Sequence, residues 1–130
     1  MSTSLPQNPS EHRVVVLGAT PKPARYAYQA VQQLHADGYQ VLPIHPKIGE
    51  IEGIPVFSQL AQVAQPIHTL TLYIGPQRSD AMVEEILAAQ PQRVIFNPGT
   101  ESTPLQQALE QQGAECVIGC TLVMLRTQQF

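Results

Sequence analysis

The sequence predicts an α/β domain with a Rossmann-like, doubly wound, mostly parallel five-stranded sheet that carries helices on both faces. Two observations support this prediction. Short apolar segments of strand length alternate with segments of helical periodicity along the chain, and this alternation is typical of parallel strands joined by right-handed crossovers. The first apolar run, residues 14–17, stops at Gly18 and leads into a helical segment, which is how nucleotide-binding α/β domains begin.

The composition limits the class of protein. A length of 130 residues with 43% hydrophobic residues suits one globular domain. The net charge of −3 argues against a nucleic-acid partner, and no apolar run approaches the roughly 20 residues that a membrane-spanning helix needs. Two cysteines do not make a disulfide framework. We expect a cytoplasmic protein with a flexible N-terminal arm at residues 1–12 and one domain over residues 13–130.

Five strands are predicted where apolar runs meet turn residues. The first is the run at 14–17, and the others are expected at 40–45, 69–74, 93–96 and 115–118. Pro43 lies within the second of these and removes one ladder hydrogen-bond donor. Residues 48–55 contain two glycines and a proline and are predicted to form a loop. Ser58 is then expected to cap one helical turn over residues 59–63.

The first two helices follow from apolar residues at helical spacing. The first carries Ala27, Ala30, Val31 and Leu34 on one face and is predicted to end near Gly38, because a glycine just past the last turn is a common C-terminal cap. The second is predicted from about residue 80, with apolar residues at 83, 86 and 87 on one face, and a proline at 91 ends it.

The third helix has clear start and stop signals. Thr103 can cap it, Pro104 fits the first helical position and Gln106 completes a capping box, while Gly113 marks the end. A last short helical stretch is expected at residues 122–125.

The unusual turn residues all fall at one edge of the predicted sheet. They lie at 18–26, 45–47, 75–78 and 97–101, and parallel sheets bind ligands outside the carboxyl ends of their strands. Gly18 permits a close approach of a ligand to the backbone. The start of the first helix offers free N–H groups, and Lys22 and Arg25 add positive charge there. We therefore predict that a phosphorylated ligand binds at this turn.

The turn after the second strand bears on the identity of the ligand. Dinucleotide-binding domains carry three glycines in the first turn and an acidic residue here for the ribose hydroxyls. This chain has one glycine in the first turn and His45, Pro46 and Lys47 at the second position. A lysine suits a ribose that carries a phosphate, as in coenzyme A and NADP. The glycine-poor first turn favours coenzyme A over NADP.

Five segments carry a resemblance to a known family: GATPKPARYAY, KIGEIEGIP, TLYIGP, RVIFNPGTES and CTLVMLRTQQF. In this order they resemble the small single-domain coenzyme A-binding proteins, which are related to the coenzyme A-binding domain of the succinyl-CoA synthetase α subunit. The resemblance extends from about Arg13 to Phe130. The phosphohistidine segment and the nucleotide-binding partner subunit of the synthetase have no counterpart here. The resemblance therefore implies binding of coenzyme A or an acyl-CoA and does not imply ligase activity.

The resemblance also implies which residues contact the coenzyme A, and they belong to four turns. The implied binding residues are Gly18, Ala19, Thr20, Pro21, Lys22, Arg25 and Tyr26 for the phosphates, His45, Pro46 and Lys47 for the adenosine, Gly75 and Pro76 for the adenine or pantetheine, and Asn97, Pro98, Gly99 and Thr100 for the pantetheine arm. If Lys47 holds the 3′-phosphate, Lys47→Ala should weaken coenzyme A far more than dephospho-coenzyme A.

Two other classes of function stay open. One is an enzyme that handles acyl-CoA with His45 or Cys120 as its reactive group, although no recognisable catalytic constellation marks the sequence. The other is an NAD(P)-binding redox sensor of the same fold. Cys120 follows Gly119 at a predicted strand end, where a mixed disulfide with the coenzyme A thiol is a hypothesis. The remaining histidines show no metal-binding spacing.

The expected assembly follows from surfaces that need cover. Open sheet edges and the apolar segment at residues 122–125 make a homodimer, or a complex with another protein, the candidate assembly. The coenzyme A ligand is the small-molecule partner that we expect.

Overall fold

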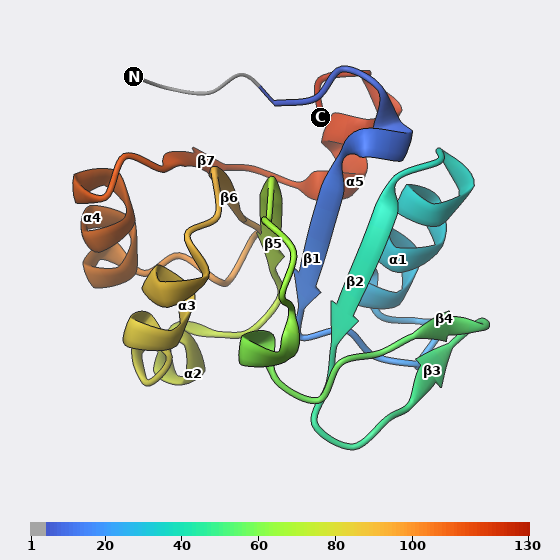
Figure 1. Cartoon of the computed structure of the whole chain (residues 1–130), viewed down its shortest axis with the longest axis horizontal. Coiled ribbons are helices and arrows are strands. Elements are labelled where there is room, and N and C mark those ends of the chain that lie inside the picture. The colour runs from blue at the N-terminus through green and yellow to red at the C-terminus, as the bar shows by residue number, and fades with distance from the viewer. Residues whose placement is uncertain (1–4) are drawn as a thin grey trace.

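The computed structural model describes residues 5–130 of the chain. Five strands form one parallel sheet in the order β2-β1-β5-β6-β7 (Figure 1). The strands are β1 (Arg13–Leu17), β2 (Gln40–Ile44), β5 (Thr69–Leu72), β6 (Arg93–Phe96) and β7 (Glu115–Ile118). The predicted fold class and the five predicted strands are confirmed, with β5 two residues shorter than expected. The chain builds outward from β1 to β2 and then crosses to β5 on the other side of β1, so the strand order reverses between β1 and β5.

The central strands of the sheet are buried on both faces, which explains the continuous run of four apolar residues in β1. Val14 and Val16 point into one core, while Val15 and Leu17 point into the other. Because successive side chains of a strand point to opposite faces, a strand covered on both sides needs an apolar residue at every position.

Helices cover the two faces of the sheet (Figure 1). α1 (Tyr26–Ala36) and α5 (Thr121–Arg126) lie side by side on one face. The other face carries α3 (Val83–Ala89), α4 (Thr103–Gln111) and the 3-10 helix η2 (Leu60–Gln62), with the short α2 (Pro76–Asp80) beside α4. A further 3-10 turn, η1 (Pro9–Glu11), precedes β1. Among the described residues no helix has the length and apolar content required to cross a bilayer.

The predicted loop at 48–55 is instead a small antiparallel hairpin of β3 (Glu50–Ile51) and β4 (Ile54–Pro55). The two residues between these strands, Glu52 and Gly53, have φ angles of 51° and 81°. Two consecutive positive φ angles are the mark of a tight hairpin turn. The loop prediction was wrong because only one of the two turn positions carries a residue that favours this conformation.

Three helix starts also differ from the prediction. The helix expected from about residue 80 is divided into α2, which begins at Pro76, and α3. The N-cap of α4 is Ser102, whose Oγ accepts a hydrogen bond from the Leu105 N–H at 3.3 Å, so Thr103 and Gln106 do not form the predicted capping box. Gln59, rather than Ser58, is the N-cap of η2.

The predicted arm at residues 1–12 is partly covered by the structure. Residues 1–4 lie outside the described residues. His12 is buried, and its Nε2 lies 2.8 Å from the Thr69 Oγ1. His12 is therefore packed with the domain, while flexibility of the preceding residues stays a prediction.

Candidate functional site

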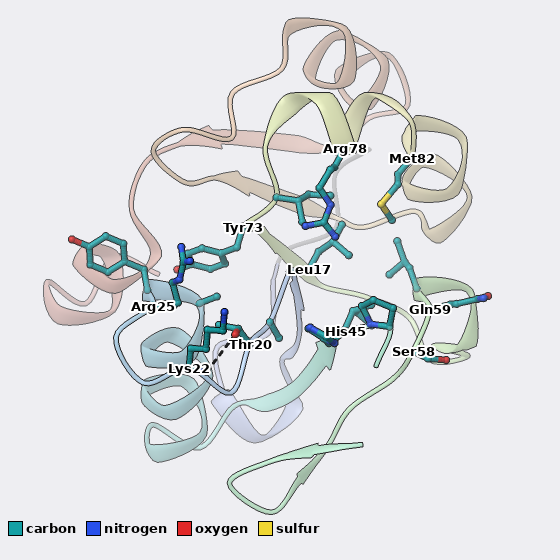
Figure 2. Close-up of a pocket in the computed structure, with 18 of the residues that line it drawn as sticks. Leu17, Thr20, Lys22, Arg25, His45, Ser58, Gln59, Tyr73, Arg78 and Met82 are labelled. Atoms are coloured by element: carbon teal, nitrogen blue, oxygen red, sulfur yellow. Dashed lines mark hydrogen bonds between the residues drawn. The ribbon is translucent and has the colours of Figure 1, made fainter. Parts of the chain in front are cut away.

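A cavity of about 790 Å³ opens at the carboxyl ends of β1, β2 and β5, beside the reversal of strand order (Figure 2). Nine of the residues predicted from the sequence line it: Gly18, Ala19, Thr20, Lys22, Arg25, Tyr26, His45, Pro46 and Pro98. This is the place where open parallel sheets bind their ligands. The four predicted turns therefore contribute unequally to the cavity wall, because the turns after β1 and β2 supply eight of these nine residues.

The turn between β1 and α1 can be made only with a glycine at position 18. Gly18 has a φ of 95°, and a Cβ built there would lie 2.9 Å from the Ile74 Cγ2 and 3.0 Å from the Tyr73 carbonyl carbon. Both the φ angle and the space exclude a side chain. The turn thus lies directly against the end of β5 and leaves its own backbone open to the cavity.

Positive charge enters the cavity from the same turn. Lys22 and Arg25 are exposed and line the cavity (Figure 2). The Lys22 N–H donates to the Thr20 Oγ1 at 3.3 Å, which shapes the turn. Arg25 is the N-cap of α1 and makes no side-chain hydrogen bond to the helix. The first N–H groups of α1 therefore face the cavity region without a side-chain cap, beside two cations.

The end of β2 contributes His45 and Pro46. The His45 Nδ1 accepts a hydrogen bond from the Lys47 backbone N–H at 3.0 Å. Because that ring nitrogen is an acceptor, the neutral imidazole carries its proton on Nε2. Lys47 is exposed and does not line the cavity in the described structure. The predicted adenosine-binding turn is therefore present, but its lysine lies outside the cavity wall.

The turn after β6 has a largely structural role. Asn97 is buried, and its Nδ2 donates to the Thr71 Oγ1 and to the Leu72 carbonyl oxygen, both at 2.8 Å. Its Oδ1 accepts from the Thr121 N–H at 2.9 Å. All polar atoms of the side chain are thus engaged in joining β5, β6 and α5. Thr100 is also buried and donates to the Asn97 carbonyl oxygen at 2.8 Å.

Seven predicted residues therefore do not line the cavity: Pro21, Lys47, Gly75, Pro76, Asn97, Gly99 and Thr100. In the turn after β6, Asn97 and Thr100 are buried, and the hydrogen bonds of the Asn97 side chain direct it into the protein. Gly75 and Pro76 form the exposed start of α2.

The predicted binding residues leave out one wall of the cavity, although Arg78 is the last residue of the predicted turn at 75–78. Arg78, Met82 and Glu85 line it from α2 and α3, and Ser58 and Gln59 line it from the segment before η2. Arg78 lies on α2, Met82 is the N-cap of α3 and Glu85 lies on α3. Since the helix breaks between them, the periodicity of one helix does not group these three residues. The segment before η2 lies beside the end of β2, because the His45 N–H donates to the Phe57 carbonyl oxygen at 2.9 Å. That contact has no local sequence signal.

Tyr73 is a half-buried residue of the cavity wall. Burial raises the pKa of its phenol to about 12, so the hydroxyl stays protonated at neutral pH. That hydroxyl is buried and has no hydrogen-bond partner among the described residues. The Tyr73 ring therefore presents an apolar surface to the cavity rather than an acid or base.

The two residues considered for chemistry lie in different places. His45 lines the cavity, whereas Cys120 is the partly buried N-cap of α5 and does not line it in the described structure. Burial raises the pKa of the other thiol, Cys116, to about 11, which keeps it protonated. Within the part of the chain that the structure describes, no three histidines, cysteines or acids gather as a metal site would require.

Comparisons with known proteins identify the family of the chain. Residues 12–126 match the family model described as CoA binding domain. A crystal structure of an uncharacterized protein is 43% identical, covers 92% of this chain and 98% of that chain, and superposes with a TM-score of 0.86. The uncharacterized protein YneT of Bacillus subtilis (strain 168) is 22% identical over 106 residues, which are 82% of this chain and 78% of YneT.

A larger protein contains a similar fold. The dinucleotide-forming acetyl-coenzyme A synthetase 1 of Ca. Korarchaeum cryptofilum superposes with a TM-score of 0.72 at 17% identity. The match covers 88% of this chain but only 26% of that synthetase, and at this identity it shows a shared fold alone. The family match is the stronger finding, since it extends over nearly the whole of the described structure. By that match, the chain belongs to the CoA binding domain family.

Proposed function

We propose that the cavity binds coenzyme A or an acyl-CoA, and that the protein is a non-catalytic binding or sensor module. The observation that carries this proposal is the wall made by the turn between β1 and α1. There Gly18 leaves the backbone open, and Lys22 and Arg25 add two positive charges beside the start of α1. Such a helix start attracts phosphate through free N–H groups and the helix dipole.

The rest of the cavity suits the uncharged parts of such a ligand. Its volume of about 790 Å³ falls within the range typical of small-molecule sites. Leu60 and Met82 give it apolar surface, and Ser58 and Gln59 give it neutral hydrogen-bonding groups. Coenzyme A has its diphosphate between an adenosine group and an uncharged pantetheine chain, so the diphosphate can lie at the turn with Lys22 and Arg25 while the pantetheine chain lies along the neutral part of the cavity.

The end of β2 favours coenzyme A over NAD, and the first turn favours it over NADP. His45 and Pro46 line the cavity at the position where an NAD-binding domain presents an acidic residue to the ribose hydroxyls. The first turn also has a single glycine where dinucleotide-binding domains use three. An NAD(P)-binding redox sensor is the second candidate.

The direct test is calorimetric titration of the protein with coenzyme A, acetyl-CoA, dephospho-coenzyme A, NADP and ATP. We expect binding of coenzyme A and acetyl-CoA, with weaker binding of dephospho-coenzyme A. Binding of NADP alone would show that the ligand is NADP rather than coenzyme A, and it would leave the assignment of the fold unchanged. An absence of binding to all five would overturn the proposal.

The non-catalytic role needs a separate test, because His45 lines the cavity and leaves acyl-CoA chemistry as an alternative. The protein is incubated with acetyl-CoA, and free coenzyme A thiol is measured with time. We expect no release above the rate without protein. Release that is lost in His45→Gln, or in Cys120→Ser, would instead identify an enzyme.

A further inference from the structure

Arg78 is the one arginine or lysine that reaches the cavity from outside the turn between β1 and α1, among the described residues. It lies on α2, which starts directly after β5 with Gly75 as N-cap and Pro76 at its first turn. The next residue, Ser79, is fully buried and faces the protein. Arg78 is exposed, and Figure 2 shows its guanidinium group pointing into the cavity from the α2 wall, whereas Lys22 and Arg25 enter from a separate wall.

The lysine expected to serve a second phosphate does not line the cavity. Lys47 is exposed and is not part of the cavity wall in the described structure. Its backbone N–H is committed to the His45 Nδ1, which holds the turn with the imidazole on the cavity side. Arg78 thus supplies, from a different element, the positive charge that Lys47 was predicted to supply.

We infer that Arg78 binds the phosphate on the 3′ oxygen of the ribose, while the turn with Lys22 and Arg25 holds the diphosphate. This inference rests on the proposed function. Coenzyme A carries these two phosphate groups on opposite faces of one ribose ring, so cations on two different walls can reach them separately. A guanidinium group binds a terminal phosphate through two parallel hydrogen bonds, which a lysine cannot do.

Glu85 limits where this phosphate can lie. It lines the cavity from α3, the helix that follows α2, whereas Arg78 lies on α2. A carboxylate repels a phosphate, so the 3′-phosphate is confined to the Arg78 end of the wall. The Glu85 end, with Met82 beside it, is left for an uncharged part of the ligand.

The test compares the affinities for coenzyme A and dephospho-coenzyme A in the wild type, Arg78→Gln and Lys47→Gln. We expect the wild type to prefer coenzyme A by about tenfold, the gain from a charge-assisted contact. Arg78→Gln should reduce this preference to about one, because the glutamine has no charge to offer the extra phosphate. Lys47→Gln should keep the wild-type preference.

Two controls separate this contact from a general effect of charge. Arg126→Gln removes an arginine from α5 that does not line the cavity, and it should leave both affinities unchanged. Arg25→Gln should weaken both ligands by the same factor. Thermal unfolding of each variant confirms that it is folded, and Arg78→Lys provides a second variant that keeps the charge and loses the two-pronged contact.

Each other outcome contradicts the inference. If Arg78→Gln lowers the affinities for both ligands by the same factor, Arg78 contacts the diphosphate instead. Loss of the preference in Lys47→Gln and not in Arg78→Gln would return the 3′-phosphate to Lys47. If the wild type binds coenzyme A and dephospho-coenzyme A equally well, the protein makes no favourable contact with the 3′-phosphate. A wild type that binds neither ligand would overturn the proposed function itself, which is a distinguishable result.

Discussion

At the scale of single residues, Gly18 carries the tightest constraint of the cavity wall. Its φ of 95° disfavours any side chain, and an added Cβ would lie only 2.9 Å and 3.0 Å from atoms of Ile74 and Tyr73. We predict that Gly18→Ala lowers the free energy of unfolding by about 2 kcal/mol, because a strained φ and a shift of the β5 end are both required. Urea unfolding measures this change.

Gly49→Ala is the matched control for this prediction. Gly49 lies outside the positive-φ region, and no atom lies within 4 Å of the Cβ that alanine would add. Alanine there should change the free energy of unfolding by less than about 0.5 kcal/mol. Equal stabilities of the two variants would show that the turn relaxes without cost.

Asn97 is the residue at which a structural role and a ligand-binding role can be separated. Its side chain makes three buried hydrogen bonds, to the Thr71 Oγ1, the Leu72 carbonyl oxygen and the Thr121 N–H. We predict that Asn97→Ala costs about 3 kcal/mol of unfolding free energy, because buried polar groups lose their partners. The affinity of the folded protein for coenzyme A, measured by calorimetry, should change by less than about threefold.

The opposite result for Asn97→Ala would support the predicted contact between Asn97 and the ligand. It would consist of an affinity loss above about tenfold with a stability close to that of the wild type. The two measurements together therefore decide which of the roles the side chain has.

The candidate site was predictable where one rule acted on local sequence. The rule that ligands bind at the carboxyl ends of parallel strands singled out Gly18, Lys22, Arg25 and His45, and these residues line the cavity. The direction of a side chain at the same edge was not predictable. Asn97 turns inward because α5 offers it the Thr121 N–H, and that helix is 24 residues farther along the chain.

At the scale of elements, the start of α4 offers a direct comparison of two neighbouring hydroxyls. Ser102 accepts from the Leu105 N–H at 3.3 Å and donates to the Asp80 Oδ1 at 2.6 Å, whereas Thr103 is exposed in the first turn. We predict that Ser102→Ala costs about 1–2 kcal/mol, as the loss of a buried N-cap does. Thr103→Ala should stay within about 0.5 kcal/mol of the wild type.

Chemical denaturation of the two variants measures both values. A larger loss in Thr103→Ala than in Ser102→Ala would identify Thr103 as the cap and would return the helix start to the position predicted from the sequence.

Strands and helices were predictable to different degrees for a physical reason. The central strands β1, β5 and β6 are buried along nearly their whole length and are mostly apolar, and this signal is strong even over four residues. The β3–β4 hairpin has only two residues in each strand, and its turn places Glu52 at a φ of 51°. Its support comes from Tyr28 of α1, whose hydroxyl donates to the Glu52 carboxylate. A contact between residues 24 positions apart leaves no periodic pattern.

At the scale of the whole molecule, the amino ends of the strands form a second polar cluster, at the edge of the sheet away from the cavity. His12 and His68 precede β1 and β5, and Arg93 begins β6. Phe130 packs against this group: its ring lies 4.5 Å from the Arg93 guanidinium carbon and 5.6 Å from the His12 ring. The cluster thus ties both ends of the described chain to the sheet.

We expect the buried histidines of this cluster to make the folded protein less stable in acid. Burial, with the nearby Arg93 and His68, lowers the pKa of His12 from its usual 6.5 to about 4. The pKa of His68 is lowered as well, chiefly by burial. Between pH 6.5 and 4 the unfolded chain therefore binds a proton at His12 that the folded protein does not bind. Stability must fall as the pH decreases through this window, and His12 adds no further loss below it.

We predict that His12 accounts for about 2 kcal/mol of the stability lost between pH 6.5 and 4, after allowance for solvent screening. Urea unfolding of the wild type and of His12→Gln, at intervals of half a pH unit, measures the difference. Glutamine can keep a polar contact with the Thr69 Oγ1 and has no proton to bind in this range. The variant should therefore lose less stability than the wild type on acidification, and parallel pH profiles would show that His12 is protonated in the fold at little cost.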